Sequence, residues 1–228
     1  MNYKKKLLKA IQLSFKNYIK FGARSSKKLY PLHHEIVNIS KNIFGKSYEY
    51  HSYDNKELKV KGKYYDKNID ITITKNNIPI CGIGVKFVTS NYKQNANNYF
   101  ENMMGETANI QANQIPYFHF IVLRHQTPYY KKTSQKTGKK TADKIETINK
   151  KDLMKYINLI LDNPQAHRPR AIGIFLIDID ENSNKVTATN LKNHFDSDFI
   201  ELFENNLSIE KLFDEIKNYK NFIELKNG

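Results

Sequence analysis

The feature that most constrains the fold is a run of three short segments in which apolar and polar residues alternate with a period of two. The segments cover residues 58–65, 68–74 and 78–89, and turn-forming residues separate them at 66–67 and 75–77. Alternation with this period is typical of β-strands, and such short connections favour hairpins between them. The sequence therefore predicts a three-stranded antiparallel meander near the middle of the chain.

Segments with helical periodicity surround the meander. Apolar residues recur with the spacing of one helix face in residues 4–20, 31–44, 91–114, 153–161, 191–205 and 208–221. Two further apolar runs, 117–124 and 171–178, have the length of buried strands. This mixed order predicts an α/β fold of the α+β sandwich type, in which helices flank a mixed central β-sheet that contains the meander.

The charge of the chain predicts an anionic partner. Its 37 Lys and Arg residues outnumber its 23 Asp and Glu residues, which gives a net charge of +14. Nucleic acid is the first candidate for that partner and an anionic membrane surface is the second.

Part of this charge lies in residues 126–146, a polar, Lys-rich segment without a core pattern, which predicts an exposed loop. Lysines in such a loop contact DNA phosphates and add affinity rather than sequence reading. The expected phosphate contacts are Lys131, Lys132, Lys136, Lys139 and Lys140. Arg124 is among the candidates for DNA bases, because base reading needs planar, forked groups. A merely solvated loop is the alternative.

Several classes of protein are disfavoured by what the sequence lacks. Cys81 is the single cysteine, which excludes an intrachain disulfide framework and a Cys-based zinc site. The histidines, among them His125 and His194, are scattered and do not predict a histidine-metal nuclease site. No apolar stretch has the length of a membrane span, and the basic, amphipathic start is unlike a signal peptide. We therefore expect a cytoplasmic protein without a membrane partner.

The residues that point to chemistry lie in segment 67–88. A hairpin joining the second and third strands can place Asp70 and Lys86 side by side on one sheet face. The Asp70 carboxylate can hold a divalent metal ion, and the Lys86 ammonium can position an attacking water and offset charge on a phosphate. An exposed cross-strand ion pair is the alternative.

Metal-assisted phosphodiester hydrolysis usually needs a second carboxylate. The position two residues before Lys86 is Gly84, so the carboxylate has to come from elsewhere. The following helix offers Glu101 and Glu106; we expect Glu101, because the fourteen residues 87–100 suffice to finish the strand, turn and run back over the sheet. Glu106 is its rival. Two further acids, Glu35 and Glu49, are candidates for outer-sphere water contacts.

Asp70 followed by Gly84-Val85-Lys86, in the order helix, meander, helix and strand, resembles the PD-(D/E)XK nuclease superfamily. Ile69-Asp70 stands where that family has Pro-Asp, and Gly84-Val85-Lys86 stands where it has Asp/Glu-x-Lys. Some type II restriction endonucleases of the superfamily carry a small residue at the acidic position and a displaced Glu on the next helix, and Glu101 matches that pattern approximately. The resemblance covers roughly residues 22–125.

The resemblance implies one restriction-endonuclease-like domain over residues 1–228. Its catalytic core would span 22–125, its basic loop 126–146, and its C-terminal helices with a core strand 147–228. The implied function is that of a type II restriction endonuclease, which hydrolyses phosphodiester bonds at a specific sequence in double-stranded DNA with Mg²⁺.

The implied roles concern Asp70, Val85, Lys86 and Glu101. Asp70, Glu101 and the Val85 carbonyl would bind the metal ion, and Lys86 would act on the attacking water. The expected partners are double-stranded DNA, a second copy of the chain in a homodimer, and a cognate DNA methyltransferase. The alternatives are a repair nickase or junction resolvase on the same fold, and a non-catalytic nucleic-acid-binding module.

Overall fold

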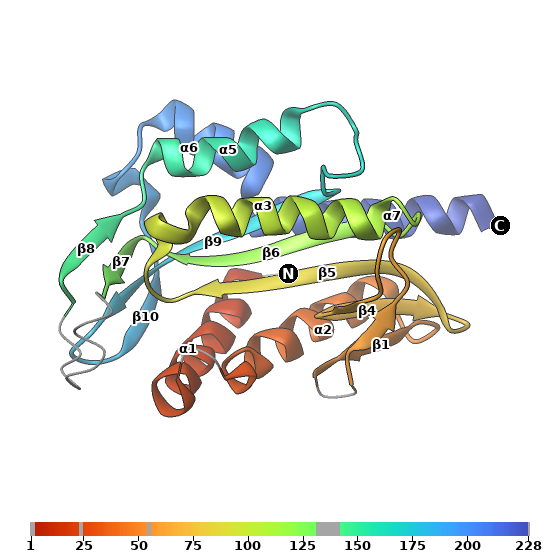
Figure 1. The fold of residues 1–228 in the computed structure, drawn as a ribbon, viewed down its shortest axis with the longest axis horizontal. Helices are drawn as coiled ribbons and strands as arrows, with labels where there is room; N and C mark the ends of the chain where they lie inside the picture. Colours follow the sequence, from red (N-terminus) through yellow and green to blue (C-terminus); the bar gives the residue numbers. More distant parts are fainter. Residues whose placement is uncertain (1–2, 23–24, 54–55, 131–141, 228) are drawn as a thin grey trace.

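The computed structural model describes residues 3–22, 25–53, 56–130 and 142–227. Its centre is a mixed, six-stranded, curled β-sheet with helices on both faces, which confirms the α/β class (Figure 1). The strands of this sheet, in spatial order, are β1 (Glu49–Ser52), β4 (Ile71–Lys75), β5 (Ile78–Val88), β6 (Tyr117–Arg124), β9 (Ala171–Asp180) and β10 (Lys185–Ala188). The pairs β5–β6 and β6–β9 are parallel, and the other pairs are antiparallel.

Two hydrophobic cores form on the two faces of this sheet. The first contains residues of α1 (Tyr3–Phe21), α2 (Tyr30–Phe44) and α7 (Ile209–Asn227), and the second contains residues of α3 (Tyr92–Gln111), α5 (Lys150–Leu161) and α6 (Ser197–Leu207). Short 3₁₀ turns, η1 (Ser26–Lys28) and η3 (Leu191–Asn193), precede α2 and α6. Because helices cover both faces, all eight residues of β6 are buried, and the strand reads as one apolar run.

The helical periodicity predicts these helices to within six residues at each end, the largest differences being at the start of α6 and the end of α7. The predicted meander is wrong in its first strand. In the central sheet, β4 pairs with β1 and β5, so residues 58–65 are not its neighbour. Instead, β2 (Leu58–Val60) pairs with β3 (Lys67–Ile69) in a separate two-stranded sheet.

The strand predicted over 68–74 is in fact two strands, because the chain bends at Asp70. Ile69 therefore packs with Tyr117 in a third apolar cluster, whereas Ile71 belongs to the core beneath α1 and α2. The Asp70 carboxylate stabilises the bend by accepting a 2.7 Å hydrogen bond at Oδ2 from the backbone N–H of Val85. Regular alternation would put Ile69 and Ile71 on one face, and a bend held by a tertiary contact leaves no mark in that pattern.

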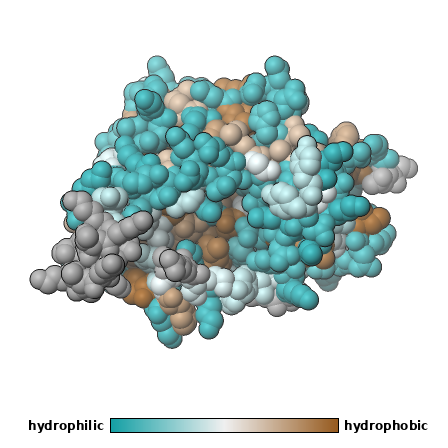
Figure 2. All heavy atoms as spheres, in the orientation of Figure 1, coloured by the Kyte–Doolittle hydropathy of each residue, from teal (hydrophilic) through white to brown (hydrophobic). Residues whose placement is uncertain are grey.

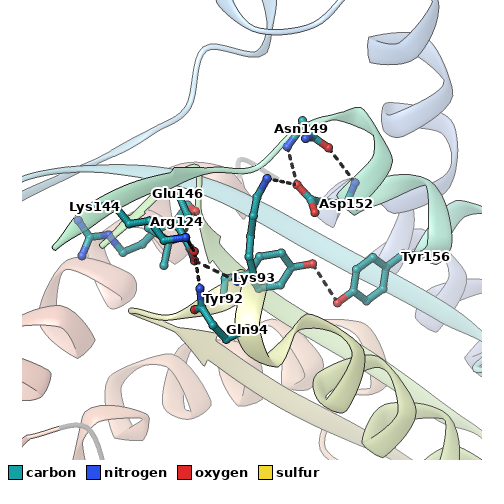
Figure 3. A network of polar contacts seen from close by, with 10 residues as sticks. Tyr92, Lys93, Gln94, Arg124, Lys144, Glu146, Asn149, Asp152 and Tyr156 are labelled. Carbon is teal, nitrogen blue, oxygen red and sulfur yellow. Dashed lines mark hydrogen bonds and ion pairs between the residues drawn. The ribbon is translucent and has the colours of Figure 1, made fainter. Parts of the chain in front are cut away.

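The loop predicted over 126–146 is also partly wrong, because its ends form a hairpin of β7 (Gln126–Tyr129) and β8 (Lys144–Thr147). Glu146 is buried and fastens this hairpin to the start of α3 (Figure 3). Its carboxylate accepts hydrogen bonds from the Gln94 side chain at 2.5 Å and from the Lys93 backbone N–H at 3.3 Å, and it pairs with Lys144 at 3.1 Å. The five lysines expected to contact phosphates, Lys131, Lys132, Lys136, Lys139 and Lys140, lie outside the described residues.

The described helices include none that combines the length and the apolar character needed to cross a lipid bilayer.

Candidate active site

A cavity of about 310 Å³ lies on the α3 side of the sheet, between β5, the bend at Asp70 and α3. In the orientation of Figure 1, Figure 2 shows a hollow near the middle of the molecule, with hydrophobic residues inside it and largely hydrophilic ones around it. The charged residues that line the cavity are Lys28, Lys67, Asp70, Lys86 and Glu106. The cavity thus combines two carboxylates with three ammonium groups.

Asp70 and Lys86, the two residues that the sequence singles out, both line this cavity. The register of β4 and β5 pairs Ile71 with Ile83, so the preceding Asp70 lies beside Gly84 and Val85. Burial is the main cause that raises the pKa of Asp70 to about 7, and the negative charge of Glu106 raises it further, while the hydrogen bond from Val85 opposes both. A carboxyl group in this state gains much from a bound cation, because a cation favours the charged form.

The second carboxylate of the cavity belongs to Glu106 rather than to Glu101. Glu106 accepts a short hydrogen bond from the Tyr117 hydroxyl, and its Oε2 lies 3.3 Å from Nζ of Lys67. Glu101 is exposed, does not line the cavity and lies within electrostatic reach of Lys155 on α5.

The phase of the helix explains this difference. Glu106 is five positions after Glu101, which corresponds to a rotation of roughly 140° about the helix axis beyond one full turn. The buried face of α3 includes Met103, Thr107 and Ile110, and Glu106 flanks that face. Chain length alone therefore allows both acids to reach the sheet, whereas helical phase favours Glu106.

Lys86 is exposed at the cavity mouth, with its Nζ 5.1 Å from the centroid of the Tyr99 ring. Lys28, from η1, lies near it, since burial and the positive charge of Lys86 both lower the pKa of Lys28. Sequence reasoning missed Lys28 and Lys67 as site residues. Lys28 does lie within residues 22–125, which the family resemblance covers, but nothing in its spacing singles it out.

Gly84 has no room for the acidic side chain that the family pattern places there. A Cβ atom at this position would lie 2.8 Å from Nδ1 of His119 and 3.0 Å from the Tyr117 hydroxyl. His119 cannot easily yield, because its Nε2 lies 2.8 Å from the Thr107 hydroxyl, and burial lowers its pKa to about 4, so its ring is neutral. Tyr117 and His119 thus fill the space next to Gly84, and the Tyr117 hydroxyl donates a hydrogen bond to Glu106.

Replacing Gly84 by alanine is expected to destabilise the protein by about 1–3 kcal/mol, because the added methyl group overpacks a fixed site. Urea denaturation measures this cost. The matched control is Gly105→Ala in α3, where an added Cβ meets nothing within 4 Å. That change is expected to add about 0.5–1 kcal/mol of stability through helix propensity. Equal stabilities of the Gly84→Ala variant and the wild type would contradict the tight packing around Gly84.

The other predicted site residues lie as follows. Val85 lines the cavity and donates its N–H to Asp70; a metal-binding role for its carbonyl stays a prediction. Arg124 is 4% exposed, forms an ion pair with Glu181 and donates a 3.2 Å hydrogen bond to the Thr89 carbonyl. This buried, paired guanidinium does not fit the predicted contact with DNA. The outer-sphere candidates Glu35 and Glu49 do not line the cavity.

Comparison of this chain with known protein families, curated proteins and solved structures found no match.

Proposed function

We propose that this protein is a Mg²⁺-dependent endonuclease acting on double-stranded DNA, with a restriction-endonuclease-like fold and the sequence-specific activity of a type II restriction enzyme. One observation carries the proposal: Asp70, Glu106 and Lys86 come from three different elements and line the same cavity. The net charge of +14 supports a polyanionic substrate.

The donor set suits a hard divalent cation. Asp70 and Glu106 offer carboxylate oxygens, which Mg²⁺ prefers, and a bound cation would offset the repulsion by which Glu106 raises the pKa of Asp70. When bound, the ion would supply Lewis-acid polarisation of the scissile phosphate and lower the pKa of a bound water. The Val85 carbonyl would complete the protein ligands.

The side chains of this chain have separate tasks in hydrolysis. Lys86, as an ammonium group, orients the attacking water; the proton of that water passes to solvent as the water oxygen bonds to phosphorus, and the leaving 3′ oxygen takes up a proton in turn. The bond between phosphorus and the 3′ oxygen breaks, which leaves 5′-phosphate and 3′-hydroxyl ends. Lys28 and Lys67 offset the negative charge of the phosphate and of Glu106, respectively.

The surroundings of the cavity support a duplex substrate. The Lys-rich segment 131–141 lies between β7 and β8 in the sequence. At the end of β7, the N–H of Tyr130 donates a 3.2 Å hydrogen bond to the amide oxygen of Asn91, the residue before α3. The next residue, Tyr92, lines the cavity. We propose that the Lys131–Lys140 lysines contact DNA phosphates, that a homodimer reads a two-fold symmetric site, and that a cognate methyltransferase protects the host DNA.

Incubation with plasmid or phage DNA and Mg²⁺ tests the function directly. We expect discrete fragments that disappear with EDTA, and a loss of about a hundredfold to a thousandfold in rate for Lys86→Ala. The control is Lys75→Ala. Like Lys86, Lys75 has its Nζ close to an aromatic ring, 5.3 Å from the centroid of Tyr48, but Lys75 lies outside the cavity. Its cleavage rate is expected to match the wild type.

Other outcomes of the same experiment separate the alternatives. Nicked circles without linear fragments would indicate a nickase, and cutting confined to branched DNA would indicate a junction resolvase. Binding that persists in EDTA, with no cutting at any Mg²⁺ concentration, would indicate a binding module and overturn the proposed enzyme.

A further inference from the structure

A second group of ligand-type side chains lies outside the candidate active site. His125 follows β6, Asp178 belongs to β9, and His194 follows η3. Each offers a ligand atom, two imidazole nitrogens and one carboxylate oxygen, and these atoms lie within 4.8 Å of one another. None of the three residues lines the cavity that contains Asp70.

His125 is the buried member of the group. Only 2% of its side chain is exposed, and Nδ1 has no hydrogen-bond partner among the described residues. Oδ1 of Asp178 is 3.6 Å away, which is within reach of an ion pair with a protonated imidazole but too long for a hydrogen bond. Two ligand atoms that share one tetrahedral Zn²⁺ lie roughly 3.4 Å apart. The separation of these two atoms therefore suits a shared metal ion better than a direct contact.

The backbone holds His125 beside Asp178. The N–H of His125 donates a 2.9 Å hydrogen bond to the carbonyl of Ile177, the residue before Asp178. The His194 ring packs against the His125 ring, with ring centroids 3.9 Å apart, and is exposed to solvent. The group is thus fixed at two positions and open at the third.

We propose that His125, Asp178 and His194 bind one transition-metal ion, with Zn²⁺ as the preferred metal and an open coordination position toward solvent. Two imidazoles and one carboxylate match the ligand preference of Zn²⁺, whereas Mg²⁺ prefers an all-oxygen set such as Asp70 and Glu106. The ion would satisfy the unpartnered Nδ1 of His125.

The position of this group in the fold defines what the ion would join. The carbonyl of His125 accepts a 2.8 Å hydrogen bond from the N–H of Ile148, the residue that follows β8. A metal ion held by His125, Asp178 and His194 would therefore link the base of the β7–β8 hairpin to β9 and to the connection before α6.

Zn²⁺ alone, titrated by calorimetry into the metal-free full chain, tests the proposal. We expect one tight site per chain and a rise in Tm of roughly 5–10 °C at a free Zn²⁺ concentration about 100 times Kd. Co²⁺ as a spectroscopic substitute is expected to give visible absorption bands of a low-coordinate site. The His194→Ala and Asp178→Asn changes lie at partly or fully exposed side chains, and each is expected to weaken Zn²⁺ binding at least about tenfold.

Two control variants make the test specific. His34→Ala removes an exposed histidine from α2 and is expected to bind Zn²⁺ like the wild type. Glu106→Gln disables the candidate Mg²⁺ site and is also expected to keep wild-type Zn²⁺ affinity, so that failure of the endonuclease proposal and failure of this one give different results. Absence of stoichiometric Zn²⁺ binding, equal affinity in wild type and His194→Ala, or loss of Zn²⁺ binding in Glu106→Gln would overturn the proposed site.

Discussion

Glu106→Gln is expected to reduce Mg²⁺-dependent DNA cleavage by about a hundredfold to a thousandfold. Glu106 is the second carboxylate of the cavity, and glutamine keeps its size while it removes the negative charge that a divalent ion needs. Initial rates of plasmid cleavage at a series of Mg²⁺ concentrations measure the effect. The concentration needed for half-maximal rate is expected to rise as well.

The matched control comes from the same helix. Glu101→Gln makes the identical chemical change one and a half turns earlier, on an exposed position outside the cavity. We expect this variant to cleave within about twofold of the wild-type rate, as surface substitutions usually perturb little. The reverse result, a defect in Glu101→Gln with full activity in Glu106→Gln, would restore the assignment that the family pattern implies.

Asp70→Asn is expected to abolish cleavage and, at the same time, to stabilise the protein at pH 8 in EDTA. Burial raises the pKa of Asp70 from its ordinary value of 3.8 to about 7. Between these two pH values the unfolded chain has already lost the proton that the folded chain retains, so the free energy of unfolding falls as the pH rises. The full loss is at most on the order of 4 kcal/mol, reduced by solvent that reaches the carboxyl group through the cavity.

Urea denaturation at pH 4 and pH 8 without divalent ions measures this effect. Asparagine cannot ionise, so the variant is expected to gain about 2–4 kcal/mol relative to wild type at pH 8 but little at pH 4. Asp66→Asn, at an exposed carboxylate 3.6 Å from Lys59, is the control and is expected to show no such change. A stability difference between Asp70→Asn and wild type that does not depend on pH would refute the raised pKa.

The same titration bears on catalysis and on metal binding. A divalent ion binds the ionised carboxylate, so cleavage by the wild type is expected to increase as the pH rises through about 7. Mg²⁺ is expected to stabilise the wild type at pH 8 and to have little effect on Asp70→Asn.

Local periodicity predicts most of the helices and buried strands, because each of them buries one face or both. It fails at Asp70, where a hydrogen bond from Val85 bends the chain, and at Glu146, a charged residue whose burial depends on Gln94 and Lys144. Val85 and Gln94 are distant in sequence from the carboxylates that they contact, and composition alone predicts that Glu146 belongs to a polar loop.

The candidate site, like the fold, was only partly predictable from the sequence. Motif spacing singles out Asp70 and Lys86, and both line the same cavity, although Asp70 lies at a bend between β3 and β4 and not on a continuous strand. The choice between Glu101 and Glu106 depends on helix phase, and the pairing of His125 with His194 depends on how β6 and η3 meet in space. Arg124, expected among the residues that read DNA, is itself buried and pairs with the exposed Glu181, a contact that its place in the sequence does not reveal.

The attachment of the β7–β8 hairpin to α3 has a mechanical consequence. The Glu146 carboxylate is hydrogen-bonded to the first turn of α3, and Glu106 lies about 20 Å further along the same continuous helix. A helix of this kind behaves as a stiff rod, so a displacement applied to the hairpin shifts the far carboxylate as well. A polyanion that binds at the hairpin and displaces it would thereby also move Glu106, the carboxylate proposed to take part in bond cleavage.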